Sequence, residues 1–222
     1  MSNTAVAIMA KAPWPGQAKT RLCPPLSFEA AAQLYRAFLL DKIGQVGGLP
    51  AGPAISYAPA EAKAVFESLA PSHFSLIQQQ GRDLGARLLS TFEQLFNLGY
   101  ELALAIDSDT PTLPTAYLER ALDLLTNTGI DVVLGPSEDG GYYLIGLRRP
   151  YRELFEGIAW STSHVLSQTL QRSQEQRLQV ACLDPWYDVD TPDDLHRLRR
   201  SLDQINAGQA QHTRRFLMEQ LW

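Results

Sequence analysis

The chain has 222 residues, of which 19 are basic and 24 acidic, so its formal net charge is −5. A chain of this length is expected to form one domain (residues 1–222) and to fold without a disulfide or a structural metal. The mild acidic excess argues against a protein that coats nucleic acid, although a local basic loop can still bind phosphate.

The chain shows no sign of export or of a membrane anchor. Its first apolar run, residues 5–10, has no basic residue before it and is too short for a signal-peptide core or a membrane span. The two cysteines, Cys23 and Cys182, form no CxxC pair and no zinc-binding spacing. We therefore expect a cytoplasmic protein with neither a membrane nor a nucleic acid as its partner.

Short apolar runs and helical periodicities alternate along the chain. The runs predict buried strands at residues 6–9, 54–57, 74–77, 102–106, 132–134, 142–147 and 180–183. Periodic or capped segments predict helices at residues 27–46, 60–69, 84–96, 115–125, 161–172, from 191 onward, and at 213–222. Prolines and a glycine make residues 11–26 a long loop.

This alternation predicts a three-layer α/β/α domain with a mostly parallel, mixed sheet. Continuous apolar strands such as residues 102–106 suit a sheet that is covered on both faces. The run at 142–147 follows its predecessor through Gly140-Gly141. That connection is too short for a crossover, so this strand should run antiparallel or leave the sheet.

Unusual loops follow four of the predicted strands. They span residues 11–22, 107–109, 137–141 and 188–190. If the four strands are parallel, these loops meet at the carboxyl edge of the sheet, where open α/β sheets bind their ligands.

The first of these loops, which we call the basic loop (residues 11–22), carries three cations and no acid. Lys11, Lys19 and Arg21 can neutralise phosphate oxygens, and Pro13 and Gly16 let the backbone turn around a ligand. The alternative is a solvated basic loop. A Walker A loop is excluded, because that motif needs glycine where this chain has proline and alanine.

Paired aspartates follow two of the strands. Asp107 and Asp109 stand two apart after one strand, and Asp188 and Asp190 follow another. Carboxylates crowded at strand ends repel one another unless a hard cation such as Mg²⁺ or Mn²⁺ binds them. The alternative is that they serve as turn and helix-cap residues, with Asp190 next to the Thr191-Pro192 helix start.

The loop Glu138-Asp139-Gly140-Gly141 brings two acids and a bare backbone to the same edge, and its glycines permit close approach of a substrate. A plain tight turn is the alternative. Arg82 opens a predicted helix, where it could meet an anion or a base, beside Asp83 as an expected N-cap.

Trp160 precedes Ser161-Thr162-Ser163 and is a candidate for the lining of a substrate pocket. The alternative assigns helix capping to Ser161 and packing to Trp160.

Four segments of the chain resemble a known family. They are residues 10–22 with Lys19-Thr20-Arg21-Leu22, residues 107–111 (Asp-Ser-Asp-Thr-Pro), residues 138–143 (Glu-Asp-Gly-Gly-Tyr-Tyr) and residues 188–192 (Asp-Val-Asp-Thr-Pro). From residue 6 to residue 195 the chain resembles the radical-SAM/selenodomain-associated transferase family. That family has the GT-A, or nucleotide-diphospho-sugar transferase, fold, and its members are labelled arsenosugar-biosynthesis glycosyltransferases. The chain is also similar to phospholactate and molybdenum-cofactor guanylyltransferases.

The resemblance implies a metal-dependent transferase, most simply a glycosyltransferase that consumes a nucleotide-sugar with Mg²⁺ or Mn²⁺. Asp109 and Asp190 are the best candidates for metal ligands, supported by Asp107 and Asp188. Phosphate would be held by the cations of the basic loop, and Asp139 with the two glycines would border the acceptor or the sugar. Lys19, Arg21 and Asp109 are the candidate catalytic residues.

Other functions stay open at this point. A nucleotidyltransferase, which releases pyrophosphate from an NTP, would use the same cations and metal differently. A haloacid-dehalogenase-type phosphatase would share the Asp107-Ser108-Asp109 pattern, but Pro111 stands where that motif has threonine or valine. A non-catalytic nucleotide-binding module is the remaining alternative.

Overall fold

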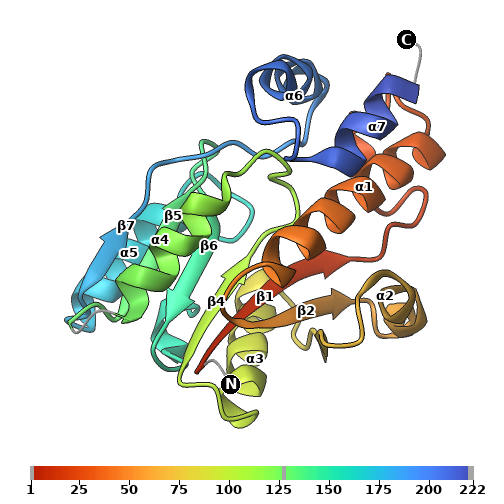
Figure 1. Cartoon of the computed structure of the whole chain (residues 1–222). Helices are drawn as coiled ribbons and strands as arrows, with labels where there is room; N and C mark the ends of the chain where they lie inside the picture. Colours follow the sequence, from red (N-terminus) through yellow and green to blue (C-terminus); the bar gives the residue numbers. More distant parts are fainter. Residues whose placement is uncertain (1–2, 127–128, 220–222) are drawn as a thin grey trace.

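The computed structural model describes residues 3–126 and 129–219, so the last part of the predicted tail helix, residues 220–222, lies outside the described residues. The described chain folds around a seven-stranded sheet of order β3-β2-β1-β4-β6-β5-β7 (Figure 1). The strands are β1 (Thr4–Lys11), β2 (Gly52–Ala58), β3 (Ser75–Gln78), β4 (Leu102–Ile106), β5 (Val132–Pro136), β6 (Tyr142–Leu147) and β7 (Val180–Cys182).

Within this sheet only β6 runs against its neighbours, β4 and β5, whereas the other adjacent pairs are parallel. The turn between β5 and β6 is tight, because Ser137 N donates to Gly141 O (3.0 Å) and Gly140 N donates to Ser137 O (3.1 Å). Gly140 has a φ of +92°, a conformation that side chains disfavour. The antiparallel strand predicted from the short connection is therefore confirmed.

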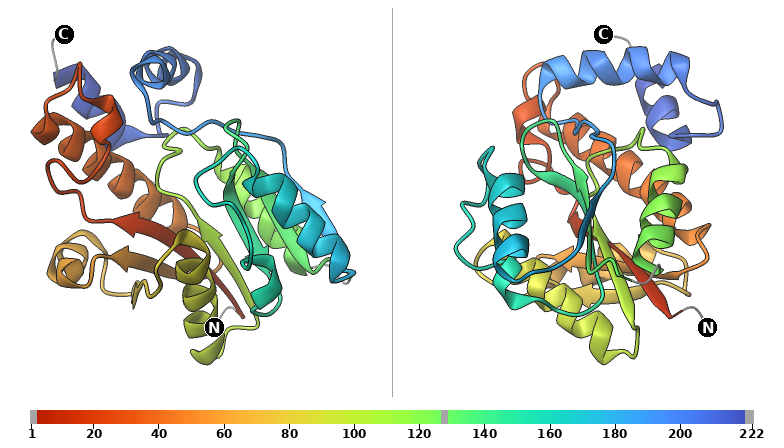
Figure 2. Two further views of the ribbon diagram at one scale, coloured as in Figure 1. Left: turned by 180° about the vertical axis from the view of Figure 1, so that it is seen from behind. Right: turned by 90° about the vertical axis from the view of Figure 1, so that its left-hand side faces the viewer.

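Helices cover both faces of the sheet, which gives three layers (Figure 2). On one face the core includes Val6, Ile8 and residues of α1 (Phe28–Gly47) and α4 (Thr115–Thr126). On the other it includes Ala5, Ala7 and residues of α3 (Leu84–Asn97), while Leu166 and Leu170 of α5 (Val165–Glu175) pack against it. Because alternate residues of a strand point to opposite faces, a strand buried on both faces is apolar throughout.

Helices α1 and α3 begin where their capping residues predict. Ser27 accepts from Ala30 N (3.1 Å) at the start of α1, and Asp83 accepts from Ala86 N (2.8 Å) at the start of α3. The prediction for residues 161–172 is wrong at its start, because α5 begins at Val165. Ser161 has a φ of +65° and so stands in a left-handed turn instead of capping the helix.

Two helices, α6 (Pro192–Gln204) and α7 (Gln211–Glu219), follow β7 and lie beyond the carboxyl ends of the strands (Figure 1). A short helix, α2 (Lys63–Leu69), stands beside β2 and β3. A capping box between Thr191 and Asp194 starts α6, as predicted. The start of α7 is held on α1 by Asp41, which accepts hydrogen bonds from His212 N and Thr213 N (2.9 Å each). Among the described residues no helix is long and apolar enough to cross a membrane.

Candidate active site

The four loops predicted to converge do meet at one edge of the sheet. The strands β1, β4, β5 and β7 all run in the same direction, so the loops after them lie side by side. Val189 N donates to Asp109 O (3.0 Å), and Ser137 Oγ donates to Asp188 Oδ1 at the long distance of 3.5 Å. The carboxyl edge is therefore built from segments that are far apart in the sequence.

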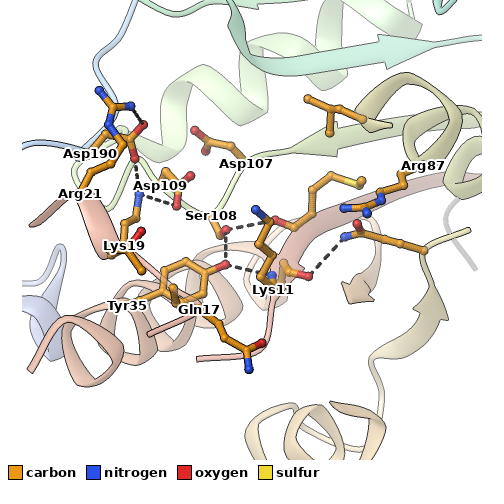
Figure 3. A pocket seen from close by; sticks show the side chains of 16 residues that line it. Lys11, Gln17, Lys19, Arg21, Tyr35, Arg87, Asp107, Ser108, Asp109 and Asp190 are labelled. Carbon is orange, nitrogen blue, oxygen red and sulfur yellow. Dashed lines mark hydrogen bonds and ion pairs between the residues drawn. The ribbon is translucent and has the colours of Figure 1, made fainter. Parts of the chain in front are cut away.

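A cavity of about 390 Å³, which we call the main cavity, opens at this edge (Figure 3). Its wall is formed by the end of β1, the basic loop, Tyr35 of α1, the beginning of α3, the loop after β4, and Asp190. Six of the predicted site residues line it: Lys11, Lys19, Arg21, Asp107, Asp109 and Asp190. A cleft of this size accommodates a small-molecule ligand.

Lys19 lies at the centre of the site. Its side chain is 5% exposed, and its Nζ lies 2.8 Å from Asp109 Oδ1 and 2.8 Å from Asp190 Oδ1 (Figure 3). The two carboxylate oxygens are thus no more than twice that distance apart, close enough to share one cation. Burial alone would lower the pKa of the Lys19 ammonium, but Asp109 and Asp190 outweigh burial and raise this pKa.

Asp190 also faces the second cation of the basic loop. Arg21 NH1 lies 3.4 Å from Asp190 Oδ2, and the Arg21 side chain is 70% exposed and free to turn toward a ligand. Burial opposes ionisation of Asp190, but Lys19 and then Arg21 hold the pKa of its carboxyl below the usual value. Asp190 is therefore ionised at neutral pH.

The other two aspartates, Asp107 and Asp188, are half-buried and interact with each other. Burial, together with the charge of Asp107, raises the pKa of the Asp188 carboxyl to about 9. Burial likewise raises the pKa of Asp107, whose Oδ1 accepts from Thr110 Oγ1 (2.7 Å). The fully buried Lys42 stands near this pair, and burial lowers the pKa of Lys42 to about 8 although Asp107 and Asp188 oppose the shift.

The residues present fit a divalent metal that arrives with its substrate. In the part of the chain that the structure describes, no group of three or more His, Cys, Asp and Glu side chains could hold a metal by itself. Asp109 and Asp190, however, already converge on one cation, the Lys19 ammonium. Mg²⁺ is commonly bound by one or two carboxylates, with substrate phosphates and waters as the remaining ligands.

Part of the backbone of the basic loop is hydrogen-bonded within the protein. Trp14 N donates to Ala12 O, and the N–H groups of Gln17 and Ala18 donate to Trp14 O. Lys11 N donates to the Tyr35 hydroxyl. Because Pro13 and Pro15 have no N–H and Trp14 N is bonded, the segment from Pro13 to Pro15 has no backbone donor to offer a ligand.

A smaller second cavity of about 210 Å³ shares Arg21 and Asp190 with the main cavity. It is also lined by Glu138, Asp139 and Asp188. The two terminal guanidinium nitrogens of Arg197, on α6, donate hydrogen bonds to the carboxylate of Glu138, and the bond from NH2 measures 2.8 Å. The sequence gives no sign of this pair, because its residues are 59 positions apart.

Several predicted site residues line neither cavity. They are Pro13, Gly16, Arg82, Gly140, Gly141 and Trp160. Gly140 packs so closely on the loop before α5 that a Cβ there would lie 2.3 Å from Ser163 O. The indole of Trp160 covers Gly85 at the start of α3, where a Cβ would lie 2.5 Å from Trp160 Nε1. Gly140 and Trp160 therefore act through packing and do not line either cavity.

Sequence reasoning also misses several residues of the main cavity wall, among them Tyr35, Ser108 and Gln79. Tyr35 belongs to the apolar face of a predicted helix, so its polar hydroxyl gives no separate signal. Ser108 stands between the two aspartates and could have been singled out by that position. Gln79 donates from Nε2 to Ala10 O (3.2 Å) and Ser56 O (2.7 Å), which ties the ends of β1, β2 and β3 together.

Comparisons with known proteins identify the family and the fold of the chain. The family described as "Uncharacterized protein conserved in bacteria (DUF2064)" matches residues 45–162. A solved protein from Desulfovibrio desulfuricans G20, described provisionally as a nucleotide-diphospho-sugar transferase, is 33% identical, with a TM-score of 0.91 over 99% of this chain and 95% of that one. No curated protein matches the chain in sequence.

More distant structures share the fold. A cytidylyltransferase from Leptospira borgpetersenii serovar Hardjo-bovis is 11% identical, with a TM-score of 0.57 over 100% of this chain and 99% of that one. Glucosyl-3-phosphoglycerate synthase from Mycobacterium tuberculosis, solved with Mn²⁺, UDP and glucosyl-3-phosphoglycerate, is 13% identical, with a TM-score of 0.52 over 90% and 77% of the two chains.

The expected fold of nucleotide-diphospho-sugar transferases is therefore confirmed. The chain belongs to the DUF2064 family, and the solved relative from Desulfovibrio desulfuricans G20 is described as a transferase.

Proposed function

We propose that this member of the family is a metal-dependent glycosyltransferase that uses a nucleoside-diphosphate sugar as its donor. The observation that carries the proposal is the convergence of Lys19 with Asp109 and Asp190, with Arg21 and Lys11 beside them, in one cavity at the carboxyl edge. Few functions other than binding a metal-complexed phosphate need both charges so close together at that edge. The whole chain would act as one domain.

In this proposal the donor's diphosphate lies against the basic loop. Lys11, Lys19 and Arg21 would contact phosphate oxygens, and Lys19 and Arg21 would stabilise the charge that develops on the leaving diphosphate. Asp109 and Asp190 would hold Mg²⁺ or Mn²⁺, with Asp107 and Asp188 behind them. When bound, the metal supplies positive charge that stabilises the leaving group.

Glycosyl transfer is favoured over nucleotidyl transfer by the backbone of the basic loop. Pro13 and Pro15 have no N–H, and the N–H groups of Trp14, Gln17 and Ala18 are bonded within the loop, so the first part of the loop supplies few backbone donors to surround a triphosphate. A diphosphate leaving group needs only a metal and a few side-chain cations. The finer resemblance, to arsenosugar-biosynthesis glycosyltransferases, points the same way.

Nucleotidyl transfer to a phosphorylated acceptor is the second candidate. Arg87 also lines the main cavity, so four cationic side chains face it, which is enough charge for an NTP. The likeness to a cytidylyltransferase supports this candidate as well.

The acceptor, or the sugar of the donor, would enter the second cavity. That cavity adjoins the main one at Arg21 and Asp190, where the reacting bond would lie. Asp139 would contact the acceptor there. Glu138 is already paired with Arg197, so its proposed role changes from direct contact to holding α6 against the turn before β6.

A thermal-shift screen of nucleoside diphosphates and nucleotide-sugars, with and without Mn²⁺, tests the proposal. A ligand that binds only the folded state raises the melting temperature by mass action. We expect stabilisation by at least one diphosphate, dependent on Mn²⁺, in the wild type and in Asp123→Asn, whose aspartate is exposed on α4. Asp109→Asn should lose the Mn²⁺ dependence. No shift with any nucleotide overturns the proposal.

A further inference from the structure

One buried tyrosine of α1 contacts both the basic loop and the acidic loop (residues 107–110). The Tyr35 hydroxyl lies 2.8 Å from Ser108 Oγ and accepts a hydrogen bond from Lys11 N (3.1 Å). Its ring centroid lies 6.0 Å from Lys19 Nζ (Figure 3). A single side chain thus reaches the start of the basic loop, its central cation and the middle of the Asp107-Ser108-Asp109 segment.

The hydrogen bonds around Tyr35 have a defined direction. Ser108 Oγ donates its proton to Met9 O (3.0 Å), so the Tyr35 hydroxyl must be the donor to Ser108 Oγ. Burial raises the pKa of Tyr35 above its usual value, which keeps this proton on the phenol. The sequence of bonds runs from Lys11 N through Tyr35 and Ser108 to Met9 O, so it starts and ends on β1.

This series of hydrogen bonds fixes Ser108, the residue between the two aspartates. With Ser108 turned toward β1, the backbone on its carboxyl side presents Asp109 to Lys19 (Figure 3). The other end of this hydrogen-bond series fixes the backbone at Lys11, where the basic loop begins. Tyr35 therefore joins the acidic loop to the start of the basic loop, in addition to the Lys19–Asp109 ion pair.

We propose that Tyr35 is a positioning residue that sets the acidic loop against the basic loop for binding of a metal-complexed diphosphate. The proposal rests on the proposed function, because it assigns Tyr35 a role in that same site. Tyr35 itself is 4% exposed and needs no contact with the reacting atoms. A small shift of a preorganised group is sufficient to lower binding and catalysis.

The test uses Tyr35→Phe, which keeps the ring and removes only the hydroxyl. Tyr151→Phe is the matched control, because Tyr151 is also buried and donates to Asp131 Oδ1 (3.0 Å), a partner that precedes β5 and lines neither cavity. Binding is measured by calorimetry with Mn²⁺ and inorganic pyrophosphate as the probe. Melting temperatures and backbone hydrogen exchange are measured without ligand.

We expect Tyr35→Phe to bind the probe roughly tenfold more weakly than Tyr151→Phe, while both melt at similar temperatures. Hydrogen exchange should increase in Tyr35→Phe at Lys11 and in the acidic loop. Ser108→Ala should show a similar loss of affinity. The double variant with Tyr35→Phe should lose little more, because both changes break the same series of hydrogen bonds.

Two outcomes overturn different claims. If the wild type binds Mn²⁺ and pyrophosphate and Tyr35→Phe binds them equally well, the positioning role is wrong and the proposed function stands. If the wild type itself does not bind the probe, the proposed function fails and the role of Tyr35 in it fails too. If the losses of affinity from Tyr35→Phe and Ser108→Ala add up in the double variant, the two residues do not act through the same series of hydrogen bonds, and the positioning role is wrong.

Discussion

Lys19 occupies the place between Asp109 and Asp190 that a metal would need, so replacing it should strengthen metal binding in the absence of nucleotide. The ammonium donates charge-assisted hydrogen bonds of 2.8 Å to both carboxylates and is almost fully buried. Each such bond contributes about 1.5–3 kcal/mol. A metal must break at least one of them, so Lys19→Met should bind Mn²⁺ roughly 10- to 150-fold more tightly than the wild type.

The affinity is measured from the electron paramagnetic resonance signal of free Mn²⁺ during titration. Lys63→Met is the control, because Lys63 is an exposed lysine that pairs with Glu67 at 3.5 Å on α2. Lys19→Met should also melt at a lower temperature and regain stability with Mn²⁺, since its two carboxylates lose the buried cation that they share. Equal Mn²⁺ affinity in Lys19→Met, Lys63→Met and the wild type would refute the reasoning.

Three further predictions follow from the same site. The pKa of Asp188 is about 3.9 in the unfolded chain and about 9 in the folded protein. Between these two pH values the folded state holds a proton on Asp188 that the unfolded state has lost, so the free energy of unfolding, measured in EDTA, should fall as pH rises. Asp188→Asn should therefore exceed the wild type in stability by about 1–3 kcal/mol near pH 8 and by little near pH 4, in urea titrations; a gap that does not grow with pH contradicts the raised pKa. Gly140→Ala should lower the free energy of unfolding by about 2 kcal/mol or more, because its φ is +92° and the new Cβ meets Ser163 O; wild-type stability in the same titration would show that the turn adjusts freely. Arg21→Ala should weaken binding of nucleoside diphosphate by roughly tenfold in calorimetry without lowering the melting temperature, since Arg21 is exposed; unchanged affinity would mean that this arginine is only solvated.

Local signals explain why much of the fold can be predicted. The buried strands are short apolar runs, and Ser27, Asp83 and Thr191 cap the helices that they precede. The direction of β6 follows from the length of one turn. The convergence of four loops needs only the assumption of parallel strands, and that assumption is correct.

The parts that could not be predicted depend on distant residues. The sequence predicts Lys19 as a phosphate ligand, but its partners Asp109 and Asp190 lie 90 and 171 positions away. No local pattern distinguishes a lysine that meets a ligand from one that meets a carboxylate. The late start of α5 has a different cause, because the left-handed turn at Ser161 overrides the capping preference of serine.

The metal ligands likewise cannot be identified from spacing. Two aspartate pairs predict four candidate ligands, whereas in the structure Asp109 and Asp190 pair with Lys19, and the pKa values of Asp107 and Asp188 are raised. The partners that each carboxylate meets, and not its spacing in the sequence, separate the two kinds of aspartate. The assignment of Asp109 and Asp190 as ligands stays a prediction.

The central claim is that the chain transfers a group from a nucleoside-diphosphate sugar with the help of a divalent metal. The most direct measurement is chromatography of nucleotides after incubation of the protein with Mn²⁺ and a panel of nucleotide-sugars, and in parallel with NTPs and sugar phosphates. The account predicts free nucleoside diphosphate from at least one nucleotide-sugar, with Asp109→Asn inactive although folded. Pyrophosphate released from an NTP, with every nucleotide-sugar left intact, would contradict the claim and assign nucleotidyl transfer instead.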